Sequence, residues 1–264
     1  MNEIRLRIHG SPALPTLIYL PGLHGDWTLV SSFRHEITGK VRFVEITYPH
    51  TTTWTLDDYA REIESALAAE GVREGWIIGE SFGSQPAWAM IAREQRGESR
   101  LNIHGLILAG GFVKHPWPLG AKFLRLVNQT MPRAGKRLFL KGYATYAKFR
   151  HRQAPDTLAN VAEFVANRLH PDDSPAIYRR FTLIIESDVA PTARACKLPI
   201  FQLAGIADPI VPVPLIRRWL KRNCPGFRES VTLYAADHNV LGTAPQKSVE
   251  YVLKWMGTTA GRPA

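Results

Sequence analysis

The chain has 264 residues, of which 45% are hydrophobic and 21% charged, a composition typical of one large globular domain or of one domain that carries an insertion. Two cysteines, Cys196 and Cys224, exclude a small disulfide-stapled scaffold, and the apolar content argues against a disordered chain. No apolar run approaches the ~18 residues that a transmembrane helix needs. Residues 1–8 alternate between apolar and polar side chains, which predicts a strand, and they lack the apolar core of a signal peptide. We therefore expect a cytoplasmic protein.

The net charge of +10 arises from 33 Lys+Arg against 23 Asp+Glu and is concentrated in one stretch. Residues 114–152 carry ten cations and no acidic side chain, whereas the segments on either side are close to balanced. A uniformly basic chain would indicate nucleic-acid binding. A local basic stretch favours a lid, a funnel for an anionic substrate or a membrane-facing patch.

Apolar runs and helical periodicity alternate along most of the chain. The apolar runs predict buried strands at residues 16–20, 41–46, 76–79, 103–109, 200–204 and 231–234. Apolar residues at helical spacing predict helices over residues 56–70, 84–96, 213–222 and 245–256. Strands that alternate with helices are typical of a mostly parallel sheet covered on both faces.

Residues 113–190 interrupt this alternation. They contain no convincing strand pattern, and their periodicity predicts helices over 119–130, 133–152, 157–169 and 176–187. We therefore predict four segments: a first part of an α/β core at 1–112, a helical cap insertion at 113–190, a second part of the core at 191–257 and a disordered tail at 258–264.

The motif Gly79-Glu80-Ser81-Phe82-Gly83 follows an apolar run and precedes a predicted helix. This is the strand–turn–helix context in which a G-x-S-x-G sequence exposes a nucleophilic serine. The turn forces the serine into a strained backbone conformation, and the flanking glycines let strand and helix approach closely. Ser81 is therefore the candidate nucleophile.

A serine hydroxyl needs a base, and the base needs an acid to orient it. In this strand–turn–helix architecture the chain order is serine, acid, histidine. His238 is the only histidine beyond the later strands and is the candidate base. Asp208 lies after the run 200–204 and a glycine turn, and is the preferred acid; Asp237 and Asp188 are weaker rivals.

The reaction also needs backbone N–H groups for the oxyanion of the tetrahedral intermediate. One is the N–H of Phe82, the residue after the nucleophile. The other comes from the glycine-containing loop after residues 16–20, where we prefer Leu23. An alignment on His24-Gly25 would make Asp26 the donor instead.

With these motifs the chain resembles the α/β-hydrolase superfamily. The resemblance rests on L-P-G-L-H-G-D, G-E-S-F-G, G-I-A-D-P-I-V-P and D-H-N at both ends of the core. It implies an α/β-hydrolase fold, with a mostly parallel central sheet flanked by helices and a helical cap insertion. It also implies Ser81, Asp208 and His238 as catalytic residues and the N–H groups of Leu23 and Phe82 as oxyanion hole, with neither cofactor nor metal.

The chain looks like the branch of this superfamily whose oxyanion loop reads L-P-G-L-x-G and whose nucleophile elbow reads G-E-S-F-G. Members of this branch are serine esterases, lipases, thioesterases and acyltransferases, so we expect a carboxylic-ester hydrolase with a Ser81 acyl-enzyme. Acyl transfer, thioester hydrolysis and C–C bond hydrolysis use the same site and stay open. A membrane-associated lipase and a non-catalytic binding protein on this fold are the further alternatives.

Residues 114–152 mix their ten cations with aromatic and aliphatic side chains. The apolar residues could pack the cap onto the core while the cations stay in water. The stretch could also be a lid whose cations meet anionic lipid, or a funnel for a small acidic substrate. The expected partners are thus a small-molecule ester and, through residues 114–152, the surface of an anionic membrane; no nucleic acid is expected.

Overall fold

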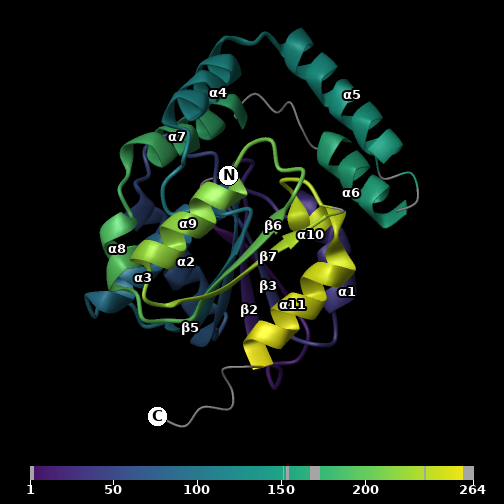
Figure 1. Ribbon diagram of the computed structural model, residues 1–264. Helices are drawn as coiled ribbons and strands as arrows, with labels where there is room; N and C mark the ends of the chain where they lie inside the picture. Colours follow the sequence, from purple (N-terminus) through teal and green to yellow (C-terminus); the bar gives the residue numbers. More distant parts are fainter. Residues whose placement is uncertain (1–2, 151, 153–154, 167–172, 235, 258–264) are drawn as a thin grey trace.

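The computed structural model describes residues 3–150, 152, 155–166, 173–234 and 236–257, and shows a single sheet with helices on both faces (Figure 1). The sheet has the order β1-β3-β2-β4-β5-β6-β7. β1 runs antiparallel to β3, and all other neighbouring strands are parallel. The strands are β1 Arg5–His9, β2 Thr16–Leu20, β3 Arg42–Thr47, β4 Glu74–Glu80, β5 Asn102–Ala109, β6 Ile200–Gly205 and β7 Phe227–Leu233.

The side chains of each central strand alternate between two separate hydrophobic clusters, because successive residues of a strand point to opposite faces. In β2, Ile18 and Leu20 belong to one cluster, and Leu17 and Tyr19 to the other. The strands are buried on both faces, which is why their sequences are continuous apolar runs. The prediction of an α/β fold with a mostly parallel sheet is confirmed.

Within the described residues, seven helices and two short 3₁₀ turns belong to the layers around this sheet. They are η1 Thr28–Val30, α1 Ser31–Ile37, α2 Leu56–Ala69, η2 Ser81–Gly83, α3 Ser84–Gln95, α8 Ala190–Ala195, α9 Val213–Asn223, α10 Val240–Thr243 and α11 Pro245–Gly257. The first cluster receives side chains of α2, α3, α8 and α9, and the second receives those of α1, α10 and α11. The two sets of helices therefore cover opposite faces.

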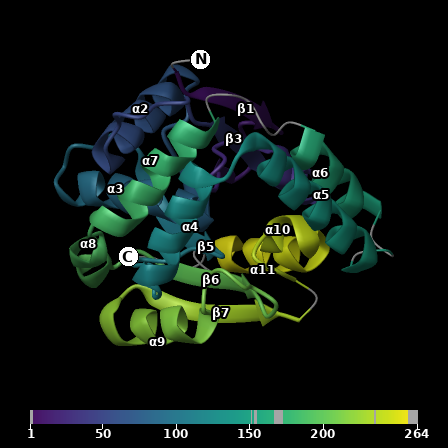
Figure 2. The same ribbon diagram turned by 90° about the horizontal axis from the view of Figure 1, so that it is seen from above.

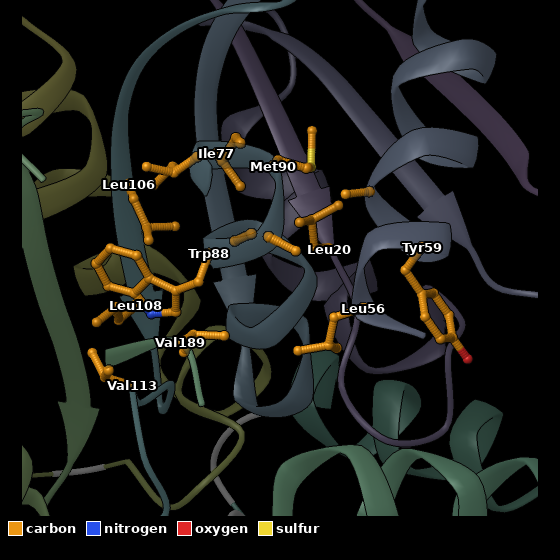
Figure 3. Packing of buried hydrophobic residues seen from close by; sticks show 14 of the residues in the cluster. Leu20, Leu56, Tyr59, Ile77, Trp88, Met90, Leu106, Leu108, Val113 and Val189 are labelled. Atoms are coloured by element: carbon orange, nitrogen blue, oxygen red, sulfur yellow. The ribbon is translucent and has the colours of Figure 1, made fainter. Parts of the chain in front are cut away.

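Helix α3 is buried over its first two turns. All residues from Ser84 to Ile91 are buried, as expected for a helix enclosed by the sheet, α2 and α8. Trp88 lies among Leu106, Leu108 and Val113 (Figure 3). Because α3 begins at Ser84, directly after the η2 turn that contains Ser81, this packing fixes the turn that carries the serine.

Four further helices lie between β5 and β6 in the chain: α4 Pro118–Thr130, α5 Arg133–Arg150, α6 Pro155–Ala166 and α7 Asp173–Glu186. α4 packs on α7, and α5 packs on α6, so that the four form two pairs (Figures 1 and 2). α6 also contacts η1, α1 and α10 of the core. α7 contributes Leu183 and Ile184 to the first core cluster, and its end is thus part of the core packing.

The predicted elements agree with the structure in type, and their ends differ by a few residues. β4 and β7 start earlier than their apolar runs, because their first residues are polar or only partly buried. Three helices were not predicted: α1, α8 and α10 have seven, six and four residues, too few turns for a clear period. Residues 167–169 of one predicted helix and the tail 258–264 lie outside the described residues. None of the described helices is long and apolar enough to span a bilayer.

Candidate active site

The turn between β4 and α3 holds Ser81 in a strained conformation. Ser81 has φ 49° and is the one described residue other than glycine with a positive φ. Two glycines make the turn sterically feasible. A Cβ on Gly83 would lie 2.1 Å from the Leu20 carbonyl oxygen, and one on Gly79 would lie 2.9 Å from Ser84 Cα. The motif's glycines are therefore required by close contacts to β2 and α3.

The side chain of Ser84 braces the same turn. Its Oγ lies 2.7 Å from the Ser81 carbonyl oxygen and 3.0 Å from the Phe112 carbonyl oxygen, and it accepts the Phe112 N–H at 3.1 Å. Gln85 Nε2 donates to the same Phe112 carbonyl at 3.1 Å. The elbow is thus tied to the loop that follows β5, an arrangement that the sequence did not predict.

The three residues predicted as a catalytic triad are brought together in the structure. His238 Nε2 lies 2.9 Å from Ser81 Oγ, and His238 Nδ1 lies 2.8 Å from Asp208 Oδ2. Ser81 follows β4, Asp208 follows β6 and His238 follows β7, so all three lie at the carboxyl edge of the sheet. Residues 157 positions apart in the chain meet there because these strands are parallel and their carboxyl ends lie at the same edge of the sheet, with β4 separated from β6 by β5 alone.

Asp208 is held in place by its own loop. Its side chain is 1% exposed, and Oδ1 accepts the backbone N–H groups of Ile210 at 2.8 Å and Val211 at 2.9 Å. This leaves Oδ2 directed at His238. The two rival carboxylates have other partners: Asp237 Oδ1 accepts from the Asn239 N–H, and Asp188 Oδ1 accepts from the Ala190 N–H.

Charge around His238 favours the protonated ring. Burial by itself lowers the pKa of His238, but the hydrogen bond and charge of Asp208 outweigh it, and Glu80 and Asp237 add to their effect. The pKa of His238 therefore lies above its ordinary value. A histidine so placed can accept a proton from Ser81 and be stabilised as imidazolium.

Glu80, the residue before the serine, is buried and hydrogen-bonded. The Tyr19 hydroxyl of β2 donates to Glu80 Oε2. Burial raises the pKa of Glu80, and the hydrogen bond from Tyr19 and the charge of His238 partly offset this. Burial, followed by the charge of Glu80, raises the pKa of Tyr19 as well. The second position of the G-x-S-x-G motif thus supplies a buried acid close enough to act on the base.

The loop after β2 passes against the nucleophile. A Cβ on Gly22 would lie 3.5 Å from Ser81 Cβ, and the Gly25 N–H donates to the Gly22 carbonyl at 3.0 Å. Within the described residues, the Leu23 N–H has no hydrogen-bond partner. Asp26, the other candidate donor, is part of the next turn, where its Oδ1 accepts the Thr28 N–H at 3.0 Å.

The buried guanidinium of Arg180 holds this loop from the side of α7. Arg180 is 0% exposed; its Nη1 donates to the Leu23 carbonyl at 2.6 Å, its Nη2 to the Pro49 carbonyl at 3.0 Å and its Nε to Tyr59 Oη at 3.3 Å. All three acceptors are uncharged. Gly25 is required next to it, because a Cβ there would lie 2.5 Å from Nη1. The sequence did not predict that Arg180 holds this loop in place.

Aromatic side chains connect the helices α5 and α6 to the same loop. The rings of Tyr143 and Phe164 lie 6.1 Å apart, and the rings of Phe164 and His24 lie 4.8 Å apart. Burial raises the pKa of Tyr143, with a further contribution from Asp237 and Glu80. α5 is therefore connected to the loop after β2 through Phe164 of α6. Among the described residues, no cluster of His, Cys, Asp and Glu side chains is placed to hold a metal ion.

No protein-family model and no curated protein sequence matches this chain significantly. Solved structures match over almost its whole length. An esterase from Thermogutta terrifontis superposes with a TM-score of 0.74 at 17% identity, covering 97% of this chain and 93% of that one. The enol-lactonase from Burkholderia xenovorans LB400 gives 0.75 at 17%, covering 96% of each chain. MenH from S. aureus gives 0.76 at 15%, covering 99% and 100%. The chain therefore has the α/β-hydrolase fold.

Proposed function

We propose that this protein is a serine hydrolase that cleaves carboxylic esters through an acyl-enzyme on Ser81. The observation that carries the proposal is the hydrogen-bonded series Ser81 Oγ, His238 Nε2, His238 Nδ1 and Asp208 Oδ2, with contacts of 2.9 and 2.8 Å, on a strained elbow. Structures of the same fold that are named esterases and an enol-lactonase add support.

In the first half-reaction Ser81 Oγ attacks the ester carbonyl carbon while His238 takes the hydroxyl proton. The tetrahedral oxyanion is stabilised by backbone N–H groups, for which we propose Leu23 and Phe82. Collapse of the intermediate breaks the bond to the alkoxy oxygen, and His238 protonates the departing alcohol. Water then attacks the acyl-enzyme with His238 as base, which releases the acid and restores the Ser81 hydroxyl.

Asp208 has an electrostatic and orienting role in this scheme. Its carboxylate accepts the Nδ1–H of His238, which leaves Nε2 free to accept the serine proton and stabilises the imidazolium. We propose residues 113–190 as the cap that determines which acyl and alcohol groups reach Ser81. In this segment Arg180 contacts the oxyanion loop at the Leu23 carbonyl, and Phe164 contacts the ring of His24 and is itself packed by Tyr143.

The test is hydrolysis of nitrophenyl esters from acetyl to palmitoyl by the wild type, by S81A and by S65A. Ser65 is an exposed serine on α2 and serves as the matched control. We expect S81A to lower kcat on the order of 10⁵–10⁶-fold and S65A to leave it unchanged. Activity that survives in S81A would contradict the serine mechanism.

A fluorophosphonate probe separates two explanations for an inactive wild type. A narrow ester specificity predicts covalent labelling of Ser81 and no labelling of S81A, because the probe tests only the activated serine. No labelling of the wild type would indicate a binding protein on this fold and would overturn the proposal.

A further inference from the structure

The outer surfaces of α4 and α5 expose an unusual number of large apolar side chains. Thirteen such side chains are exposed among the described residues, and nine of them lie between residues 117 and 149. A solvated surface rarely gathers so many. The nine are Trp117, Leu119, Phe123, Leu124, Leu126, Leu138, Phe139, Tyr146 and Phe149.

In α4 the exposed apolar residues follow one side of the helix. Leu119, Phe123 and Leu126 recur at i, i+4 and i+7, which places them in one stripe. They are 72%, 63% and 54% exposed. The other side of α4 packs on α7, where the Asn128 side chain donates to the Ser174 carbonyl at 3.1 Å. The apolar stripe therefore stays exposed to solvent when the other side of α4 packs on α7.

In α5 both sides of the helix are apolar, but the protein covers only one. At about 100° per residue, the exposed residues Leu138, Phe139, Tyr146 and Phe149 fall within an arc of about 100°. The covered side carries Tyr143, whose ring contacts Phe164 of α6. The exposed arc has no role in holding α5 on the protein.

Cations accompany these stripes, and acidic side chains do not. Residues 114–152 contain ten Lys and Arg and no Asp or Glu. Arg125 pairs with Glu186, and Lys136 donates to Ser174. Six others are exposed and form no ion pair within the described part of the chain: Lys114, Lys122, Arg133, Arg137, Lys141 and Lys148.

We propose that the outer surfaces of α4 and α5, defined by these nine apolar and six basic side chains, bind the surface of an anionic membrane. Leucine and aromatic side chains reach the boundary between headgroups and acyl chains, while Lys and Arg contact lipid phosphates. A second copy of the chain is a poorer fit, because it would bring like charges into contact. The inference concerns binding alone and does not depend on ester hydrolysis.

Sedimentation with vesicles tests this inference. S81A protein is mixed with phosphatidylcholine vesicles that contain phosphatidylglycerol, or with phosphatidylcholine alone; the S81A substitution prevents any lipid turnover. We expect binding to the anionic vesicles at low salt, much weaker binding at high salt and little binding to phosphatidylcholine alone. Absence of binding to anionic vesicles at low salt would overturn the inference.

Two variants locate the contact. R137Q/K141Q/K148Q should lower the partition coefficient on the order of 100-fold, because each cation near an anionic surface contributes about a fivefold factor. F139S/F149S should lower binding at high salt as well as at low salt. Controls on α9 lie away from α5 (Figure 2): R218Q/K221Q/R222Q removes three exposed cations, the same number as the α5 variant, and L215S removes an exposed apolar side chain. Both should bind like wild type.

Two outcomes would contradict the location or the partner. If the α9 variants weaken binding as much as the α5 variants, the attraction reflects the net charge of the molecule. If light scattering shows a dimer that F139S/F149S dissociates, the surface is an interface between copies of this chain.

Discussion

Glu80 lies beside Ser81, the proposed nucleophile, and its charge raises the pKa of His238, the proposed base. Its carboxylate is buried, accepts the Tyr19 hydroxyl and contributes to the raised pKa of His238. Glutamine at this position keeps the size and the hydrogen-bond acceptor but removes the charge. The electrostatic effect of Glu80 can therefore be measured apart from its packing.

E80Q should move the acidic limb of the kcat/KM profile to lower pH. His238 must be neutral to accept the serine proton, so activity rises with pH through its pKa. In the wild type this limb lies at higher pH than an ordinary histidine would give, because the His238 pKa is raised by Asp208, Glu80 and Asp237 against the effect of burial. Removing the Glu80 charge lowers that pKa. Glu74 lies at the exposed start of the same strand, so E74Q should leave the acidic limb of the profile at its wild-type pH. An acidic limb that does not move in E80Q would contradict an effect of the Glu80 charge on His238.

Replacing Arg180 by lysine should lower the turnover number, kcat. R180K retains the charge, but an ammonium cannot replace the planar guanidinium that reaches Leu23, Pro49 and Tyr59 together. In the proposed mechanism the loop after β2 stabilises only the transition state, so we expect kcat to fall on the order of tenfold with KM little changed.

The neighbouring R179K is the matched control for R180K. Arg179 lies on the same helix and donates to the Trp54 carbonyl at 3.0 Å, and it makes no hydrogen bond to the oxyanion loop within the described residues. R179K should keep the wild-type kcat. Equal losses in the two variants would mean that Arg180 acts through the stability of α7 alone.

Among the elements, the β4–α3 turn has no room for an added methyl group at Gly83, whereas helix α5 has room for one at Gly142. G83A places a methyl group against the Leu20 carbonyl and should lower the free energy of unfolding by about 3 kcal/mol, with loss of activity. G142A adds a methyl group in α5 with no atom within 4 Å, and should raise stability by about 0.5–1 kcal/mol. Urea denaturation of the two variants measures both values. A G83A protein as stable as wild type would contradict the close contact at the elbow.

The long helices and strands could be predicted from the sequence, whereas the short helices could not. Continuous runs such as β5 and long amphipathic helices such as α2 have patterns that local sequence displays. α2 also has a capping box, in which Thr55 Oγ1 accepts the Asp58 N–H and Asp58 Oδ2 accepts from Thr55. The short helices α1, α8 and α10 depend on tertiary contacts instead, and were missed.

At the scale of the whole molecule, the reactivity of the two cysteine thiols measures global unfolding. Cys196 and Cys224 are free and buried, and burial raises the pKa of Cys196 to about 12 and that of Cys224 above its ordinary value. Neither should react with Ellman's reagent in the native protein at pH 8, and both should react in urea. The labelling midpoint should coincide with the loss of circular dichroism. Fast labelling without denaturant would show that this part of the core opens locally.

The sequence by itself determined the sheet, the strained serine turn and the identity and chain order of Ser81, Asp208 and His238 as candidates, because each has a local pattern of residue types. The tertiary structure decided what depends on distance in space. It placed the three side chains within hydrogen-bond range, set Arg180 under the oxyanion loop and placed Glu80 against Tyr19. It also left the outer sides of α4 and α5 exposed. A pattern of apolar residues shows that a helix has an apolar side, and only packing decides whether the protein itself covers that side.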